Sequence, residues 1–556
     1  MSEQHLQRET TYFIPEKKVS APPLPKDSTP KNFKVLLVYP NYSMVNLLPT
    51  NIGILTACLR QNGFVVDLFD TTFYRTSEKT LDEIRVETLQ VRKFDLEEFG
   101  VRFKPGTFIE DFQKKVAGFQ PNLIAVTAVE DTWPQARKML ESVSDYPAPV
   151  IVGGVFPTLA SDVPIAHPDV DMICVGEGEH AIIELANKLN DGDDYSRIRN
   201  LWVKKDGKII KNQMRPPIDM NDVPFGDFDQ FETERFYRPM QGKIARMVPI
   251  ETDRGCPYTC RFCEAPSLVE LYKENTGQHY FRRKDWSIVR EELLLFIKKY
   301  EADYVYFNAE TFLAMSKPEF DEFLKMYKDI KLPFWIQTRV ETLNEYYVQN
   351  LESVGCNRIS IGLEHGNEDF RKKIVGKGFS NQRIVDLFKM LDRSSIPITI
   401  NNILGFPDET RELIFDTIGL NRQLGSDSCN AYIFTPYQGT SMYNDAADRG
   451  FLSPGVETDS ILTGSILNMP SISKEEILGL VRTFNLYVKF PKEEWAEIEL
   501  AEKFTPEGDA KFAELSGKYY ERFFDHDFKW TKKACISTSV YNGPAVDKQA
   551  TETLTG

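Results

Sequence analysis

The sequence lacks the features that mark several large classes of protein. Its 556 residues contain no run near the roughly 18 apolar residues of a membrane span, and the N-terminus has no apolar signal-peptide core. Acidic residues outnumber basic ones by 82 to 67, so the net charge of −15 disfavours binding to nucleic-acid phosphates and to anionic membranes. These absences predict a cytoplasmic protein with no membrane span and no nucleic-acid partner.

Cysteine and histidine are also scarce, with 8 and 6 residues. Five of the cysteines stand alone in the sequence, which indicates buried free thiols in a reducing compartment rather than a disulfide framework. They are Cys58, Cys174, Cys356, Cys429 and Cys535. The other three lie together in one short loop.

The first part of the chain alternates short apolar runs with helical segments. Residues 1–31 contain several prolines and no period, and we expect a mobile or surface-draped tail. Residues 32–200 predict an α/β domain with a doubly wound, Rossmann-like parallel sheet, whose ligand crevice lies at the carboxyl ends of the strands. Its strand-like runs are 33–39, 65–70, 122–129, 148–154 and 171–179.

A second alternation follows a hairpin and linker at residues 201–244. Residues 245–450 carry six strand-like runs with helical segments between several of them, which fits a partial parallel (β/α)6 barrel with its site at the strand ends. Residues 451–556 are charged, aromatic and helical in pattern, and predict an appended helical domain. The six runs are 246–252, 303–307, 333–338, 357–361, 397–404 and 429–434.

The stretch RGCPYTCRFCEAP (254–266) places Cys256, Cys260 and Cys263 in one loop after the first barrel strand. Thiolates bind soft metals, and a structural zinc site normally has four protein ligands. The next histidine along the chain is His279, sixteen residues past the last of the three cysteines, so no fourth ligand is visible nearby. Three thiolates suit a [4Fe–4S] cluster with one iron open to a small molecule. A zinc site completed from afar and incidental cysteines are the alternatives.

This C-x₃-C-x₂-C loop resembles the radical S-adenosylmethionine (SAM) superfamily. Four later segments resemble successive strand ends of its cobalamin-associated class, and the likeness covers roughly residues 33–445. It implies that the open iron binds SAM by its amino and carboxylate groups and that SAM is cleaved reductively. The four segments are TRVETL (338–343), ISIGLEHGNEDFRKKIVGKG (359–378), ILGFPDET (403–410) and FTPYQGTSMY (434–443).

The resemblance also implies roles for single residues around SAM. Phe262 would flank the adenine, Glu310 would lie near the amino group, and Arg339 would hold the carboxylate with its guanidinium fork. Glu364 would face the ribose or methionine end, and Gly405 would let the backbone approach the adenosyl group. Rim ion pairs and simple turn chemistry are the alternatives. No residue is assigned to the chemical step itself.

The front domain has no histidine between residues 33 and 166, where the D-x-H-x-x-G motif of the mutases would lie. Its PNYSMVNLLPTNIGIL segment resembles the start of cobalamin domains attached to radical SAM enzymes, which implies cobalamin without a lower-face histidine ligand. A flavodoxin-like domain that binds a nucleotide or nothing is the alternative, although no G-x-G-x-x-G or P-loop follows the first strand. The expected contacts are Asn51, Gly53, Thr127, Glu130, Gly153, Gly154, Gly176, Glu177, Gly178 and Glu179.

The resemblance implies an enzyme that forms a 5′-deoxyadenosyl radical and modifies an unactivated carbon, with methylation as the first hypothesis. Cyclisation or rearrangement without methyl transfer is the second hypothesis. A corrinoid or redox sensor and an RNA methylthiotransferase are further alternatives, although the latter would normally add three cysteines in the front domain and a basic final barrel. The expected partners are a small-molecule substrate of the secondary-metabolite, lipid or tetrapyrrole class, and an electron donor such as flavodoxin or ferredoxin.

Overall fold

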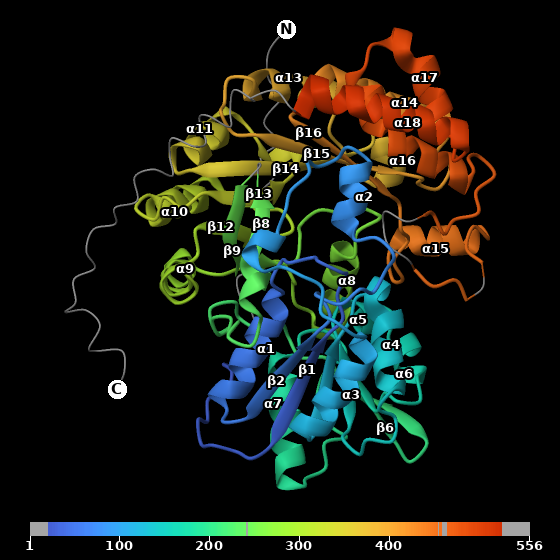
Figure 1. The fold of residues 1–556 in the computed structure, drawn as a ribbon. Coiled ribbons are helices and arrows are strands. Elements are labelled where there is room, and N and C mark those ends of the chain that lie inside the picture. Colours follow the sequence, from blue (N-terminus) through green and yellow to red (C-terminus); the bar gives the residue numbers. More distant parts are fainter. Residues whose placement is uncertain (1–20, 241–242, 454, 459–463, 525–556) are drawn as a thin grey trace.

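Two sheets and a group of C-terminal helices make up the protein (Figure 1). The structure is a computed structural model that describes residues 21–240, 243–453, 455–458 and 464–524. Most of the expected tail, Cys535 and the end of the expected helical domain therefore lie outside the described residues. Within the described part, no helix is both long and apolar enough to cross a bilayer.

The front sheet has the strand order β2-β1-β3-β4-β5-β6-β7, and its first five strands in this order are parallel. The order 2-1-3-4-5 is that of a flavodoxin-like doubly wound fold, so the Rossmann-like prediction is confirmed. The strands are β1 (Lys34–Tyr39), β2 (Val65–Asp70), β3 (Leu123–Thr127), β4 (Val150–Gly153) and β5 (Met172–Cys174). The main helices are α1 (Thr50–Gln61), α3 (Phe108–Phe119), α4 (Trp133–Glu141) and α7 (Glu179–Asp191).

The expected hairpin joins this front sheet. Strands β6 (Leu201–Lys205) and β7 (Lys208–Lys211) are antiparallel, and β6 pairs with β5. Both turn residues have positive φ, 51° at Asp206 and 72° at Gly207, as a tight type I′ hairpin requires. The sheet therefore extends to residue 211, beyond the expected domain boundary at residue 200.

The second sheet contains six parallel strands and one antiparallel edge strand, β8 (Tyr237–Met240). Its order is β16-β15-β14-β13-β12-β9-β8, which confirms the partial barrel. The parallel strands are β9 (Lys243–Glu251), β12 (Tyr304–Asn308), β13 (Phe334–Thr338), β14 (Cys356–Glu364), β15 (Ile398–Leu404) and β16 (Ser428–Ile433). The helices between them are α8 (Ala265–Thr276), α9 (Trp286–Tyr300), α10 (Lys317–Tyr327), α11 (Glu345–Ser353), α13 (Asn381–Leu391) and α14 (Arg411–Leu424).

Strand β16 lies at the open edge of this half-barrel, and two other parts of the chain cover it. Gln90, which follows α2 (Leu81–Glu87), exchanges two side-chain hydrogen bonds of 3.2 Å with the backbone of Ala431. Helix α16 (Lys474–Lys489) packs on the same strand, and Asn485 donates to the Cys429 carbonyl at 3.1 Å. An exposed strand edge invites pairing with other chains, so these contacts close it. The remaining helices of this region are α15 (Ser441–Asp448), α17 (Trp495–Ala501) and α18 (Pro506–Tyr519).

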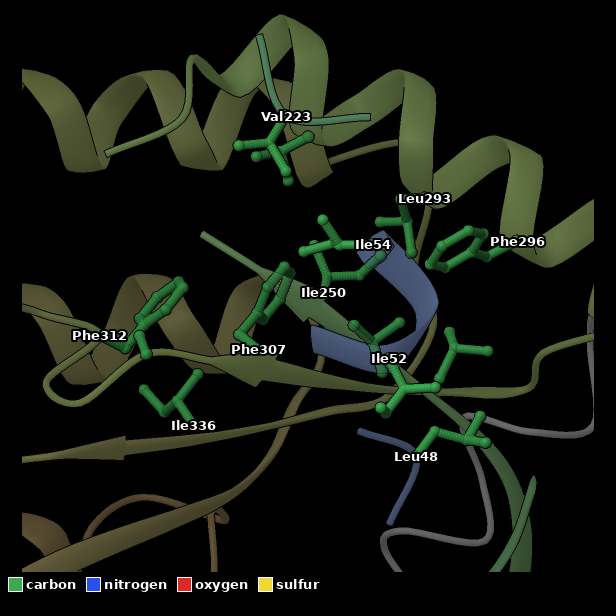
Figure 2. Close-up of a cluster of buried hydrophobic side chains, with 14 of the residues drawn as sticks. Leu48, Ile52, Ile54, Val223, Ile250, Leu293, Phe296, Phe307, Phe312 and Ile336 are labelled. Atoms are coloured by element: carbon green, nitrogen blue, oxygen red, sulfur yellow. The ribbon is translucent and has the colours of Figure 1, made fainter. Parts of the chain in front are cut away.

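The front sheet and the barrel share one apolar core. Figure 2 shows Ile52 and Ile54 of α1 beside Ile250 of β9 and Phe307 of β12, and all four are at most 3% exposed. Burial of a side chain of this kind contributes about 1.5–3 kcal/mol. The two sheets are therefore fixed to one another by packing, and their strand ends meet at a defined place.

Gly53 of α1 tests this shared core. A Cβ at Gly53 would lie 2.5 Å from the ring of Phe228, which is itself packed against Phe296 and Tyr300 of α9. We expect Gly53→Ala to lower the free energy of unfolding by about 1–3 kcal/mol, because overpacking outweighs the gain in helix propensity. The measurement is urea unfolding followed by circular dichroism.

Gly118 of α3 is the matched control, because an added Cβ there meets no atom within 4 Å. Gly118→Ala should raise the free energy of unfolding by up to about 1 kcal/mol. Equal effects of the two substitutions would contradict a packed interface at Gly53.

Candidate functional site

A cavity of about 630 Å³ lies where the strand ends of the two sheets meet. One wall consists of the ends of β3, β4 and β5 and the start of α1, including Thr127 and Asn51. The other wall comes from the barrel, including Glu251, Asn308, Glu310 and Gln337 at the ends of β9, β12 and β13. Its volume lies in the usual range for a cofactor or ligand site.

Eight of the ten residues expected to contact cobalamin line this cavity. They are Asn51, Thr127, Gly153, Gly154, Gly176, Glu177, Gly178 and Glu179. Asn51 donates a hydrogen bond of 3.0 Å to Thr127, which connects the first turn of α1 with the end of β3 across the switch point of the sheet. No histidine is among the described residues that line the cavity.

The glycines leave the floor of the cavity free of side chains. An added Cβ at Gly153 or Gly178 would meet nothing closer than 3.7 Å, so the space above these residues is open to a ligand. Gly154, with φ of 115°, instead needs to be glycine because a Cβ there would lie 2.5 Å from the Ala128 carbonyl oxygen. A broad ligand with amide groups, such as a corrin, fits this bare backbone surface.

The other two expected contacts have different neighbours. Gly53 packs against the ring of Phe228. Glu130 accepts hydrogen bonds from the backbone and side chain of Gln438 at 2.8 and 3.1 Å, and from Thr458 at 2.7 Å. Gly53 therefore packs against the linker, and Glu130 bonds to the barrel and to the segment that follows it.

The cysteine loop begins directly after the short strand β10 (Asp253–Arg254) and ends at α8. Cys256 and Cys260 are buried, Cys263 is half-buried, and all three are free thiols. Burial raises the pKa of Cys256 and Cys263. Among the described residues, no three Cys, His, Asp or Glu side chains are gathered to hold a single metal ion. Zinc would draw its sulfurs to about 2.3 Å from one ion, whereas a cluster spreads its thiolates over separate irons.

Arg339, expected at the SAM carboxylate, contacts this loop. Its Nη1 donates to Cys260 Sγ at 2.7 Å, its Nη2 donates to Glu341 at 2.6 Å, and its guanidinium lies 4.0 Å from the ring centre of Tyr258. Burial disfavours the charged guanidinium, but Cys260 and Glu341 more than offset this and raise the pKa of Arg339. The residue places a fixed positive charge beside one of the three sulfurs.

Glu310 lies at the end of β12, and its carboxylate accepts a bond of 3.3 Å from the Gly255 N–H of the loop. The surrounding protein and the nearby carboxyl of Asp253 raise the pKa of Glu310 to about 8. Its side chain nevertheless faces the cavity and is exposed there, so water in the cavity counteracts part of this shift. A bound cation at this point would favour the charged carboxylate.

Phe262 and Gly405, expected around the adenosyl group, lie close together. The Phe262 ring is 6.1 Å from that of Phe406, and Gly405 has a φ of 90° that favours glycine. Glu409 holds this turn, because its carboxylate accepts hydrogen bonds from the backbone N–H groups of both Gly405 and Phe406.

Glu364 has a cation partner that the sequence analysis did not identify. Lys377 Nζ lies 2.7 Å from its carboxylate and also donates to the Gly362 carbonyl at 2.8 Å. Both side chains are buried, and Glu364 has an unusual positive φ of 63°. The lysine lies inside the quoted segment 359–378, so its charge was visible there, but its contact with Glu364 was not.

Arg254 is another residue at the site that the sequence analysis did not single out. Although it begins the quoted cysteine stretch, only the fold shows that it lies between Glu177, Glu179 and Glu251. Burial would raise the pKa of Glu177, but Arg282 and Arg254 lower it overall.

The matched protein families agree with this arrangement. Residues 45–186 match the family model of the B12 binding domain, and residues 250–420 match that of the Radical SAM superfamily. An uncharacterized methyltransferase of Pyrococcus horikoshii is 26% identical over 68% of this chain and 81% of its own length. The anaerobic magnesium-protoporphyrin IX monomethyl ester cyclase of Rubrivivax gelatinosus is 22% identical over 65% of this chain and 66% of its own length.

Two solved structures share the fold. The radical SAM methyltransferase TsrM of Kitasatospora setae, with cobalamin and a [4Fe–4S] cluster bound, has a TM-score of 0.57, with 16% identity over 88% of this chain and 99% of its own. The cobalamin-dependent radical enzyme OxsB, with aqua-cobalamin and SAM bound, has a TM-score of 0.58, with 14% identity over 88% of this chain and 71% of its own.

Asp253 lines the cavity, and the pH dependence of stability tests how strongly its carboxyl is buried there. Burial raises the pKa of its carboxyl from an ordinary value of 3.8 to about 6. A carboxyl whose pKa is higher in the folded protein than in the unfolded chain stabilises the fold at pH values below its unfolded-state pKa. This stabilisation is lost as the pH rises through its folded-state pKa. Wild type should therefore lose stability relative to Asp253→Asn between about pH 4 and pH 7. The measurement is the urea midpoint of the iron-free proteins across this range.

Asp329→Asn, which replaces an exposed carboxyl after α10, serves as the control for the loss of one carboxyl group. A constant difference between wild type and Asp253→Asn would show that Asp253 titrates as an ordinary carboxyl.

Proposed function

We propose that this cobalamin-dependent radical SAM enzyme transfers a methyl group to an unactivated carbon of a small-molecule substrate. One observation carries the proposal: a single cavity joins the glycine-rich strand ends of the front sheet to Glu310 and Arg254, which flank the cysteine loop. The two cofactors would therefore meet in one cavity. That arrangement is needed where both act on one substrate.

The loop supplies the ligands for the iron–sulfur cluster. Cys256, Cys260 and Cys263 would hold three irons, and the fourth iron would remain open to the amino and carboxylate groups of SAM. Arg339 balances the negative charge beside Cys260 and is close enough to the loop to pair with the SAM carboxylate. Glu310 would accept the SAM ammonium, and that cation would favour the charged carboxylate over the neutral form that burial favours.

The front sheet would hold cobalamin against its strand ends. Gly153, Gly154, Gly176 and Gly178 present backbone where a planar corrin with amide arms needs close approach. When bound, the cofactors supply one-electron cleavage of SAM and transfer of a methyl group, and the protein supplies binding, orientation and exclusion of water. Tyr272 and Tyr280, stacked 4.4 Å apart, close one wall of the cavity.

Cyclisation is the second candidate, because three relatives are anaerobic magnesium-protoporphyrin IX monomethyl ester cyclases, of which this chain covers 58 to 66%. Methyl transfer consumes a second SAM and yields S-adenosylhomocysteine, whereas ring formation without methyl transfer does not. A secondary metabolite, a lipid or a tetrapyrrole would suit the cavity, and an electron donor such as flavodoxin or ferredoxin would supply electrons. Two further relatives act as bacteriochlorophyllide d methyltransferases in Chlorobaculum tepidum, which supports the tetrapyrrole class.

Cys260→Ala tests the cluster. We expect anaerobically reconstituted wild type, given SAM and a reductant, to form 5′-deoxyadenosine, and Cys260→Ala to form none because one iron loses its ligand. Cys356→Ala, a buried cysteine of β14 outside the loop, should keep wild-type product formation. The measurement is liquid chromatography with mass detection of 5′-deoxyadenosine and S-adenosylhomocysteine. Equal deoxyadenosine formation by wild type and Cys260→Ala would rule out the proposed ligand.

Gly153→Val tests the cobalamin surface. Since a Cβ at this position meets only Cys174 at 3.7 Å, the larger side chain should fold but occupy the cavity. We expect the variant to keep its iron and to lose retained corrin, measured by absorbance after gel filtration. Gly118→Ala, outside the cavity, should retain corrin at the wild-type level. Retention of corrin by Gly153→Val would place cobalamin elsewhere.

A further inference from the structure

The turn after β5, which the sequence predicted as a cobalamin contact, bonds to both sides of the cysteine loop. Residues Gly176 to Glu179 contact Arg254, two positions before Cys256, and Tyr272 in the helix that follows Cys263. The front domain thus holds the segment before the loop and the segment after it. The loop between these points carries all three sulfur ligands.

On the side before the loop, Arg254 lies among three carboxylates. Its Nη1 is 2.8 Å from Glu177 and 2.7 Å from Glu179, while its Nε and Nη2 form a two-point contact with Glu251 at 3.0 and 3.1 Å. Arg282 of β11 (Arg282–Arg283) also binds Glu177. All five side chains are at most 13% exposed, so each bond acts in a medium that screens it little.

On the side after the loop, the same turn contacts α8. The Glu177 N–H donates to the Tyr272 hydroxyl at 2.8 Å. Gly176 has a φ of 88°, and an added Cβ there would lie 2.6 Å from that hydroxyl. The backbone of the turn is therefore shaped to let α8 approach closely.

The barrel fixes the middle of the loop. Arg261 N–H donates to the Val375 carbonyl at 3.0 Å, and Met442 N–H donates to the Arg261 carbonyl at 3.2 Å. The loop is consequently held by the barrel at its centre and by the front domain at both flanks. Any shift of the front domain would change the position of the sulfur ligands relative to the strand ends of the front sheet.

We infer that Glu177 is a positioning residue that sets the placement of the cluster loop relative to the cobalamin face of the front domain. This inference rests on the proposed function for the identity of the two cofactors. The Glu177 side chain accepts from Arg254, from Arg282 and from the Ile218 N–H at 2.8 Å, so every carboxylate oxygen is engaged by the protein. The Glu177 carboxylate binds both Arg254 and Arg282, and through these two residues it holds the segment before the cysteine loop.

Glu177→Gln is the test, because it keeps the size of the side chain and removes its charge. Arg254 retains Glu179 and Glu251 as partners, so the variant should still fold. In the iron-free protein, we expect amide hydrogen exchange over residues 254–276 to become about tenfold faster, since a hydrogen bond to a charged group contributes about 1.4 kcal/mol or more.

The second measurement uses protein loaded with reduced cluster and cob(II)alamin. We expect Glu177→Gln to take up both cofactors at wild-type levels but to lose the wild-type magnetic coupling between them, read from the splitting of their electron paramagnetic resonance signals. A purely structural role would lower occupancy and leave the coupling of each loaded molecule unchanged. Glu184→Gln is the matched control, because Glu184 lies on α7, the helix that follows the Glu177 turn, and pairs with Arg215 instead of with Arg254 or Arg282.

The outcomes separate the inference from the proposed function. Unchanged exchange and unchanged coupling in Glu177→Gln would overturn the inference while leaving the cofactors in place. Failure of wild type to bind iron and corrin would overturn the proposed function, and the exchange measurement would still decide whether Glu177 holds the loop. If Glu177→Gln does not fold, Arg254→Lys, which keeps the charge and loses the two-point contact, replaces it with the same expected results.

Discussion

The meeting of two sets of parallel strand ends is the constraint on which the site depends. In each sheet the central strands, β1 to β5 in the front sheet and the six barrel strands in the second, run parallel, so their carboxyl ends and the loops that follow them gather at one edge. The shared apolar core around Ile52, Ile250 and Phe307 turns these two edges toward one cavity. Charged residues then complete the junction, because Arg254 is surrounded by carboxylates from both sheets.

The fold could be predicted almost completely from the sequence, because periodic apolar runs report burial within a single element. All six barrel strands lie within a few residues of the predicted runs, and helices lie between them as the pattern indicated. The hairpin after residue 200 was also predicted, and its turn at Asp206 and Gly207 has the positive φ values that this dipeptide favours. What the pattern did not show was that this hairpin pairs with β5, because strand partners depend on residues distant in sequence.

The site was predicted less completely, for a similar reason. The three cysteines are adjacent in sequence, and their spacing alone indicates a metal site. Glu130, by contrast, receives hydrogen bonds from Gln438 and Thr458, more than 300 positions away, and no local pattern reveals such partners. Gly53 was likewise predicted as a cobalamin contact from its place in a motif. In the structure, the ring of Phe228 occupies the space where a side chain at position 53 would lie. The resemblance therefore predicted the region in which these residues lie, whereas only the structure shows which residues they contact.

The open edge of the half-barrel explains the placement of the remaining helices. A half-barrel leaves β16 with an unpaired edge, and the chain covers it with Gln90 from the front domain and with α16 from the C-terminal region. The appended helices thus pack on the side of the barrel, where Ile477 also lies against Gly405 at the end of β15. Since Gln90 reaches β16 while Glu177 reaches the cysteine loop, the front domain is attached at the last strand of the barrel and beside the first. These two contacts lie near opposite ends of the barrel sheet, and together with the shared apolar core they join the front domain to the barrel at several places.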